Sequence, residues 1–159
     1  MSPTSDSGLL DGVRVVDLSR VLAGPFAGQI LAEMGADVIK VEPPEGDIGR
    51  GIGPHIGGRS LYFSSLNTNK RGIVLDLTTG PGRRGLDALL ESADIMIENY
   101  RPNAIEKLGL APPALLERHP RLVVVTISSY ARSSDRARDA SYDLIAQAES
   151  GIMSVTGEE

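Results

Sequence analysis

The sequence predicts an α/β protein with a mostly parallel sheet that helices cover on both faces. Runs of aliphatic and β-branched residues alternate along the chain with segments in which apolar residues recur at helical spacing. The runs are apolar almost without interruption, which is typical of parallel strands that are buried on both faces. The five predicted strands cover residues 13–18, 38–41, 72–77, 93–98 and 122–127.

The first strand opens a βαβ unit within Val13–Pro44. Pro25 suits the first position of the helix, because its fixed φ is already helical and its missing N–H would have no partner there. The apolar residues that follow have helical spacing: Phe26, Ile30, Leu31 and Met34. Gly35 then stands where a left-handed C-terminal cap is expected, directly before the second strand.

The middle of the chain contains a glycine-rich loop, Pro43–Ser60. Its six glycines are too permissive for the interior of a helix or strand, and a loop of this length is usually functional or mobile. Ser60–Asn69 is amphiphilic, which leaves its secondary structure open. Pro81–Ser92 predicts a helix whose core positions are Leu86, Leu89 and Leu90.

The last third of the chain predicts three short helices. Asn103 is expected to cap the first, with Glu106 as its capping-box partner. Pro112 and Pro113 open the second, which runs to Arg118. The polar stretch 129–140 predicts a surface loop, and Tyr142–Gly151 predicts a final helix that turns three residues inward: Leu144, Ile145 and Ala148.

In folds of this class, ligands bind beyond the carboxyl ends of the parallel strands. The expected ligand-binding edge therefore consists of the turns after Leu18, Glu42, Leu77, Glu98 and Ser128. The first turn, LSRVLAGPFAG, lacks the GxGxxG pattern that brings a backbone close to a pyrophosphate, and the chain contains neither GxxxxGK[ST] nor GxSxG. A P-loop and a serine-hydrolase elbow are therefore excluded.

Composition narrows the class of protein further. The chain has 159 residues, of which 41% are hydrophobic and 23% charged, so one globular domain over 9–159 is expected after a disordered leader at 1–8. The net charge of −5 argues against a nucleic-acid partner, and no apolar run approaches the ~20 residues that span a membrane. Cysteine is absent, which excludes a thiol nucleophile and fits the cytoplasmic location that we expect.

Few side chains in the sequence are candidates for catalysis or ligand binding. His55 and His119 are far apart in sequence and read as solvated or capping residues, and no acidic pair has metal-ligand spacing, so no metal site is predicted. Two polar clusters remain, at 67–76 (NTNKRGIVLD) and 98–107 (ENYRPNAIEK). In each, the cations are equally compatible with a solvated face and with phosphate binding, and Tyr100 offers a flat surface for a base.

Five segments together resemble the amino-terminal part of a family III CoA-transferase. They are DLSRVLAGPFAGQILAEMGADVIKVEPPEGD, SLYFSSLNTNKRGIVLDL, ADIMIENYRPNAIEKLGL, HPRLVVVTIS and YDLIAQAESGIMSVTG, and they span 10–157. The group includes formyl-CoA, carnitine-CoA and succinyl-type transferases and the related α-methylacyl-CoA racemases. The resemblance implies a truncated large Rossmann-like domain, a missing smaller domain and an interlocked homodimer.

The resemblance also implies the residues that meet CoA, which would act as a thioester substrate and not as a permanently bound cofactor. The segment that meets the adenine end is Arg20, Val21, Leu22 and Ala23. Further CoA contacts are implied at Leu75 and Asp76, within 75–78, and at Asn99, Tyr100 and Arg101. Lys107 stands where the family often carries a basic residue for the CoA phosphates, and Tyr62 and Tyr142 fall near the acyl side.

For chemistry, the resemblance implies transfer of CoA from an acyl-CoA to a carboxylic acid through an aspartyl-CoA intermediate. By motif order the nucleophilic aspartate lies beyond Glu159, and Asp143 is not that residue. No catalytic residue is therefore assigned within the chain. The chain is expected to be a fragment that supplies the CoA-binding part and is inactive alone.

Alternatives remain open at this point. The racemase branch carries a histidine directly before the aspartate of the YD motif, where this chain has Tyr142, a poor base at neutral pH; this favours a transferase over a racemase-like epimerase. Ser141 replaces the glycine that is usual before this motif, which leaves the local pose of the acyl group open. A catalytically inactive CoA-binding fragment and a Rossmann-like domain for another nucleotide are the other two readings.

Overall fold

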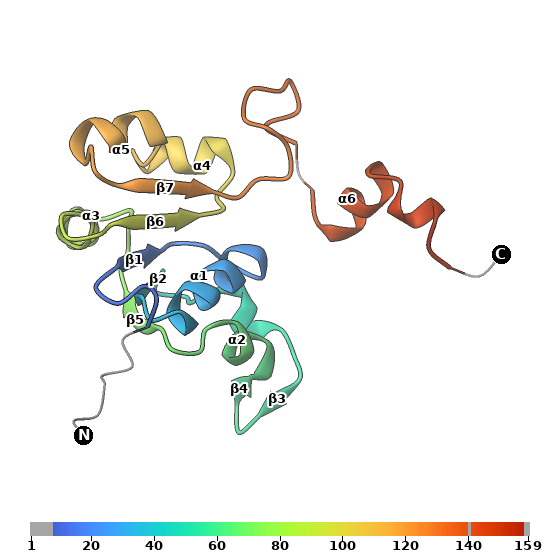
Figure 1. Ribbon diagram of the computed structural model, residues 1–159, viewed down its shortest axis with the longest axis horizontal. Helices are drawn as coiled ribbons and strands as arrows, with labels where there is room; N and C mark the ends of the chain where they lie inside the picture. Colours follow the sequence, from blue (N-terminus) through green and yellow to red (C-terminus); the bar gives the residue numbers. More distant parts are fainter. Residues whose placement is uncertain (1–7, 140, 158–159) are drawn as a thin grey trace.

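A computed structural model describes residues 8–139 and 141–157, and it confirms the α/β class with a parallel sheet (Figure 1). The sheet consists of β1 (Arg14–Asp17), β2 (Asp37–Glu42), β5 (Arg71–Val74), β6 (Ile95–Glu98) and β7 (Val123–Thr126). Its strand order is β5-β2-β1-β6-β7, and every neighbouring pair is parallel. The order reverses between β1 and β6, which makes the gap between their carboxyl ends the topological switch point.

Helices cover both faces of the sheet. Helix α1 (Ala23–Glu33) packs on the face that carries Val15 and Ile97. The opposite face, which carries Val16 and Met96, packs against α3 (Gly80–Leu90), α4 (Pro102–Lys107) and α5 (Pro112–Arg118). Because successive strand residues point to opposite faces, the apolar runs of β1, β2 and β6 fill both layers. The two edge strands differ from the prediction, since Val74 of β5 and Val123 of β7 are 63% and 57% exposed.

The remaining elements belong to the glycine-rich loop and to the carboxyl-terminal segment. The loop contains the 3-10 turn η1 (Ile48–Gly51) and a small hairpin, β3 (His55–Ile56) and β4 (Arg59–Ser60). The stretch that the sequence left open forms α2 (Leu61–Leu66), because Ser60 Oγ accepts a hydrogen bond from Phe63 N at 3.0 Å. The carboxyl-terminal segment contains α6 (Asp143–Glu149) and η2 (Ile152–Ser154).

Several predicted boundaries are confirmed and others are corrected. Gly35 has φ +104° and ends α1 as expected. Helix α1 begins at Ala23, so Pro25 occupies its third position. The N-cap of α4 is Arg101, not Asn103, because Pro102 takes the first helical position and needs no N–H partner there.

The apolar face of α6 does not point inward as predicted. Leu144 and Ile145 are 68% and 45% exposed, and Ala148 is also exposed. Figure 1 shows α6 apart from the sheet and its covering helices. It is joined to the preceding loop by polar bonds, with Arg136 donating to Glu149 at 2.7 Å. Helical periodicity predicted an apolar face correctly, but not a partner for it among the described residues.

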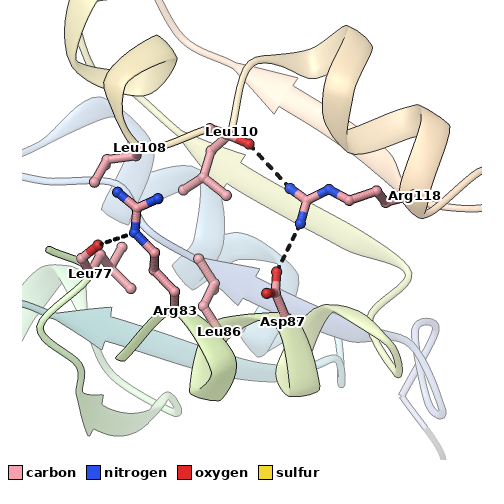
Figure 2. Close-up of a pocket in the computed structure, with 8 residues that line it drawn as sticks. Leu77, Arg83, Leu86, Asp87, Leu108, Leu110 and Arg118 are labelled. Atoms are coloured by element: carbon pink, nitrogen blue, oxygen red, sulfur yellow. Dashed lines mark hydrogen bonds and ion pairs between the residues drawn. The ribbon is translucent and has the colours of Figure 1, made fainter. Parts of the chain in front are cut away.

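Within the layer of α3, α4 and α5, one arginine connects separate segments (Figure 2). Arg118 of α5 donates to Asp87 of α3 at 3.1 Å and to the carbonyl oxygen of Gly109 at 3.1 Å. This fixes the loop after α4 against α3. The predicted surface loop 129–140 contains no helix or strand over 129–139. Its last residue, 140, and residues 1–7 of the predicted leader lie outside the described residues.

Candidate functional site

The two turns at the switch point are joined by a single side chain. Asn99, directly after β6, accepts a hydrogen bond from Arg20 N at 2.8 Å and donates to the carbonyl oxygen of Arg20 at 2.8 Å. Its amide therefore satisfies both backbone groups of one residue in the turn after β1. The structure brings these two predicted residues together, although 79 positions separate them in sequence.

Next to this bridge, an arginine lies over an aromatic ring. The Arg20 guanidinium carbon is 4.6 Å from the centroid of the Tyr100 ring, and an Arg20 terminal nitrogen donates to the Tyr100 hydroxyl at 3.2 Å. The buried Arg20 Nε has no hydrogen-bond partner among the described residues. The pair presents a flat, cationic surface at the carboxyl edge, of the kind that stacks on a nucleobase.

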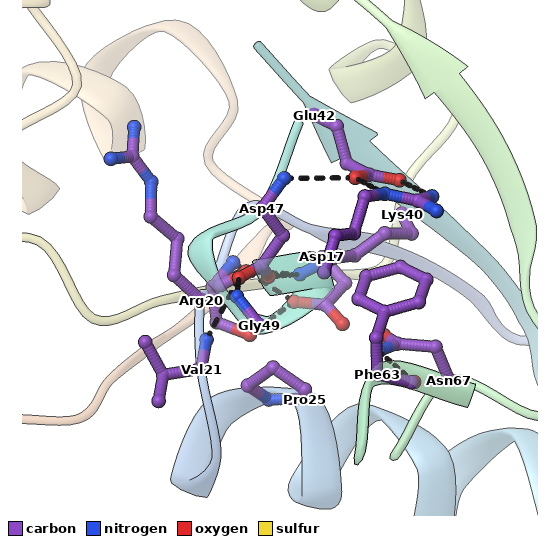
Figure 3. Close-up of polar contacts among 12 residues, drawn as sticks. Asp17, Arg20, Val21, Pro25, Lys40, Glu42, Asp47, Gly49, Phe63 and Asn67 are labelled. Atoms are coloured by element: carbon purple, nitrogen blue, oxygen red, sulfur yellow. Dashed lines mark hydrogen bonds and ion pairs between the residues drawn. The ribbon is translucent and has the colours of Figure 1, made fainter. Parts of the chain in front are cut away.

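The turn after β1 is held in a left-handed conformation that β-branched residues rarely adopt. Val21 has φ +68°, and its N–H donates to Asp47 Oδ1 at 3.2 Å. Asp47 belongs to the glycine-rich loop and pairs with buried Lys40 at 2.9 Å, and Lys40 also donates to the carbonyl oxygen of Ser19 (Figure 3). The glycine-rich loop is therefore anchored directly to the first turn.

The charge state of Asp47 fits this role. Burial by itself would raise the pKa of Asp47, but hydrogen bonds from Gly49 N and Lys40, together with the positive charge of Lys40, lower it below its ordinary value. The carboxylate is therefore ionised at neutral pH and keeps its three hydrogen-bonding partners on the turn, the loop and β2.

A second buried ion pair lies beneath the same turn. Lys70 Nζ is 2.8 Å from Asp17 Oδ2, and the two side chains are 1% and 0% exposed. Lys70 also donates to the carbonyl oxygen of Pro25 at 2.7 Å and to Asn67 Oδ1 at 2.9 Å. Burial lowers the pKa of Lys70, and the neighbouring charge of Asp17 opposes that shift.

These contacts bear on the two readings of the polar cluster at 67–76. Lys70 is buried and bonded to three oxygens, and Arg71 pairs with Asp37 at 2.7 Å. Neither cation is presented to a phosphate at the carboxyl edge. Lys70 therefore fits neither reading, because it is buried and not solvated, and its donors already have partners. Arg71 is exposed, as the solvated reading predicts.

The ligand-binding edge contains a cavity of about 310 Å³, which we call the edge hollow. Four predicted residues line it: Arg20, Leu75, Asp76 and Tyr100. Leu77 and Thr78, which complete the predicted segment 75–78, also line it. The lining residues that the sequence did not assign to a contact are Val41, Glu42, Pro43, Pro44, Glu45 and Leu108. Five of these six lie at the carboxyl end of β2 or in the turn after it, which the rule for strand carboxyl ends had already included in the predicted edge without naming its residues.

The remaining predicted residues lie around the edge hollow or away from it. Val21, Leu22 and Ala23 continue the first turn into α1, and Asn99 braces that turn. Arg101 and Lys107 are exposed at the two ends of α4. The acyl-side candidates do not line the hollow: Tyr62 is half-buried on α2, and Tyr142 is 75% exposed at the start of α6.

The described residues also bear on two other kinds of site. Among 8–139 and 141–157, no three histidine, aspartate or glutamate side chains converge as metal ligands would. Over the same residues, every helix is too short or too polar to cross a membrane.

Comparison with known proteins gives consistent matches over almost the whole chain. The model of the family described as CoA-transferase family III matches residues 10–159. The chain is 41% identical over 157 residues to the acetyl-CoA:oxalate CoA-transferase of Acetobacter aceti, covering 98% of this chain and 40% of that protein. It is 45% identical over 157 residues to the succinate–glutarate CoA-transferase of Agrobacterium fabrum, covering 94% of this chain and 39% of that protein.

A solved structure agrees with the sequence matches. A CAIB/BAIF family protein from Brucella suis superposes with a TM-score of 0.90 at 41% identity, covering 96% of this chain and 42% of the other. The chain thus spans about two fifths of the length of the relatives that it matches.

Proposed function

The chain belongs to CoA-transferase family III, and from this we propose that it forms the CoA-binding part of an enzyme that moves CoA between an acyl-CoA and a carboxylic acid. The observation that carries the proposal is the edge hollow, which extends from the carboxyl ends of β2 and β5 to the switch point and holds the Arg20–Tyr100 pair in one cavity with Leu75 and Asp76. Relatives named as CoA-transferases for oxalate and for succinate and glutarate support the same chemistry.

The edge hollow suits the adenosine end of CoA. The guanidinium and ring of Arg20 and Tyr100 offer a stacking surface, and Leu75 adds an apolar contact. Asp76 already accepts two hydrogen bonds from Thr78, its backbone N–H at 2.9 Å and its hydroxyl at 2.6 Å. Its second carboxylate oxygen can accept a hydrogen bond from a ribose hydroxyl.

We place the covalent steps on an aspartate outside this chain, as the family resemblance implies. Its carboxylate attacks the acyl-CoA carbonyl, forming an acyl anhydride and releasing the CoA thiolate. The thiolate then attacks the aspartyl carbonyl, which forms the aspartyl-CoA thioester and frees the donor as a carboxylate. The acceptor carboxylate and the thiolate repeat these two steps in reverse order, and the aspartate is regenerated. In this scheme, the chain binds the part of CoA that is remote from the reacting carbonyl, and this binding positions the carbonyl.

A homodimer in the longer form of the protein, a cytoplasmic location and the acyl-side roles of Tyr62 and Tyr142 also belong to the proposal. They rest on the family resemblance and on composition. The same holds for the absence of turnover by this chain alone, which follows from placing the nucleophile elsewhere.

Calorimetric titration of the 159-residue chain with CoA tests the binding function. CoA should bind more tightly than NAD, which lacks the pantetheine arm. Asn99→Ala should weaken CoA binding about tenfold, because two hydrogen bonds that hold the first turn are lost, and Lys107→Ala should also weaken it. Asn103→Ala, an exposed asparagine on α4 outside the edge hollow, is the matched control.

Tighter binding of NAD than of CoA would contradict the proposal and favour a domain for another nucleotide. Unchanged CoA affinity in both Asn99→Ala and Lys107→Ala would also contradict the proposed site. Far-UV circular dichroism of each variant shows whether a loss of affinity reflects a loss of folded protein.

A further inference from the structure

A second cavity adjoins the edge hollow. It has a volume of about 210 Å³ and lies where α3 faces the loop between α4 and α5 (Figure 2). We call it the side hollow. Leu77 and Leu108 line both cavities, so the two hollows meet at these residues. Leu86 and Leu110 complete the apolar part of its lining.

One cation of the side hollow has unused donors. Arg83 Nε donates to the carbonyl oxygen of Leu77 at 3.0 Å, whereas neither terminal nitrogen of Arg83 has a partner in the described part of the chain. Figure 2 shows the Arg83 guanidinium between Leu77 and Leu108, where the hollows meet. By contrast, both terminal nitrogens of Arg118 are bonded, to Asp87 and to Gly109. Arg83 therefore has a free pair of N–H groups in the fork geometry that matches a phosphate.

The two hollows differ in charge. The charged residues that line the edge hollow are one cation, Arg20, and three carboxylates; of these, Glu42 is paired with Arg50 at 2.6 Å, whereas Glu45 and Asp76 have no ion pair among the described residues. Those that line the side hollow are two cations, Arg83 and Arg118, and one carboxylate, Asp87. An uncharged base and ribose are compatible with the first hollow, but a phosphate is repelled there and attracted to the second.

We propose that Arg83 binds the 3′-phosphate of CoA in the side hollow while the adenosine occupies the edge hollow. This inference rests on the proposed function. The 3′-phosphate is attached to the same ribose as the base, so a base in the edge hollow leaves it only a short distance from the junction. As a monoester it carries a charge between about −1.5 and −2 at neutral pH, which makes it the strongest partner for an unpaired guanidinium. NAD has no phosphate at this position, so Arg83 contributes to selectivity for CoA.

Titration of the chain with CoA and with 3′-dephospho-CoA tests the inference, because the two ligands differ only in this phosphate. The unmodified chain should bind CoA about 10- to 100-fold more tightly, as expected for charge-assisted hydrogen bonds. Arg83→Gln should remove most of this preference by weakening CoA binding, with the affinity for dephospho-CoA unchanged. Arg83→Lys should keep part of it, because the charge remains while the fork is lost.

The matched control is Arg84→Gln, which makes the same charge change on the next residue of α3, outside the side hollow. This variant should keep the full preference for CoA. Equal loss of affinity for both ligands in Arg83→Gln, or an equal effect of Arg83→Gln and Arg84→Gln, would overturn the role of Arg83 alone. An unmodified chain that binds neither ligand would overturn the proposed function together with it.

Discussion

Replacing Lys70 with methionine should destabilise the chain far more than the same change at the next residue. Lys70 and Asp17 form an ion pair with 1% and 0% exposure, so Lys70→Met leaves a buried carboxylate without its counter-charge. Removing one member of such a pair costs about 3–5 kcal/mol. Methionine keeps most of the aliphatic volume of lysine, so a cavity contributes little to this loss.

Arg71→Met is the matched control. Arg71 pairs with Asp37 at 2.7 Å, but their side chains are 64% and 36% exposed, and an exposed pair contributes at most about 1 kcal/mol. Urea unfolding followed by far-UV circular dichroism gives the free energy of unfolding of each variant, since the chain has no tryptophan to serve as a fluorescent probe.

A third variant isolates the charge. If the unpaired Asp17 carboxylate causes the loss, Asp17→Asn should stabilise the Lys70→Met background, although by itself it should destabilise the unmodified chain. The reasoning is refuted if Lys70→Met costs no more than Arg71→Met, or if the free-energy changes of Asp17→Asn and Lys70→Met simply add.

Three further predictions concern the packing and charge of the first turn and of the helix that follows it. Gly28→Ala should destabilise the chain by about 1–3 kcal/mol, because a Cβ there would lie 2.7 Å from Asp17 Oδ2, whereas Gly72→Ala, with open space around it, should cost less than half as much in urea unfolding. Folding lowers the pKa of Asp47, so its contribution to stability is complete above its unfolded pKa of about 4 and is lost as the pH falls through the lower, folded value. Thermal unfolding between about pH 2 and 6 should show this loss, and a slope that is unchanged in Asp47→Asn would contradict it. Val21→Gly should raise the free energy of unfolding by about 1 kcal/mol by relieving the positive φ, and a fall measured in urea would count against strain at this turn.

The sheet was predictable because each strand carries its signal locally. Val15 and Val16 show how a continuous apolar run marks a strand that is buried on both faces, and both residues are fully buried in opposite layers. Gly35 marked the end of α1 because few other residues adopt its φ of +104° without strain. These features depend on a few consecutive residues.

The candidate site was only partly predictable, because its polar contacts join distant segments. Nothing near Lys70 in the sequence shows that its ammonium group meets Asp17, which lies 53 positions away. Likewise, the free donors of Arg83 become visible only when the chain brings Leu108 alongside Leu77. The exposed face of α6 shows a related limit. The periodicity of the sequence correctly predicts that the helix has an apolar face, but it does not predict which residues pack against that face.

The amide of Asn99 works as a molecular spacer. It makes the two hydrogen bonds with the backbone of Arg20 that a neighbouring strand would otherwise make. The length of this single side chain therefore sets the separation of the two loops. Aspartate could not donate to the Arg20 carbonyl oxygen, and glutamine would hold the loops one methylene farther apart. The separation of these two turns is therefore set by covalent geometry, and little ordering of them would be left for a bound ligand to accomplish.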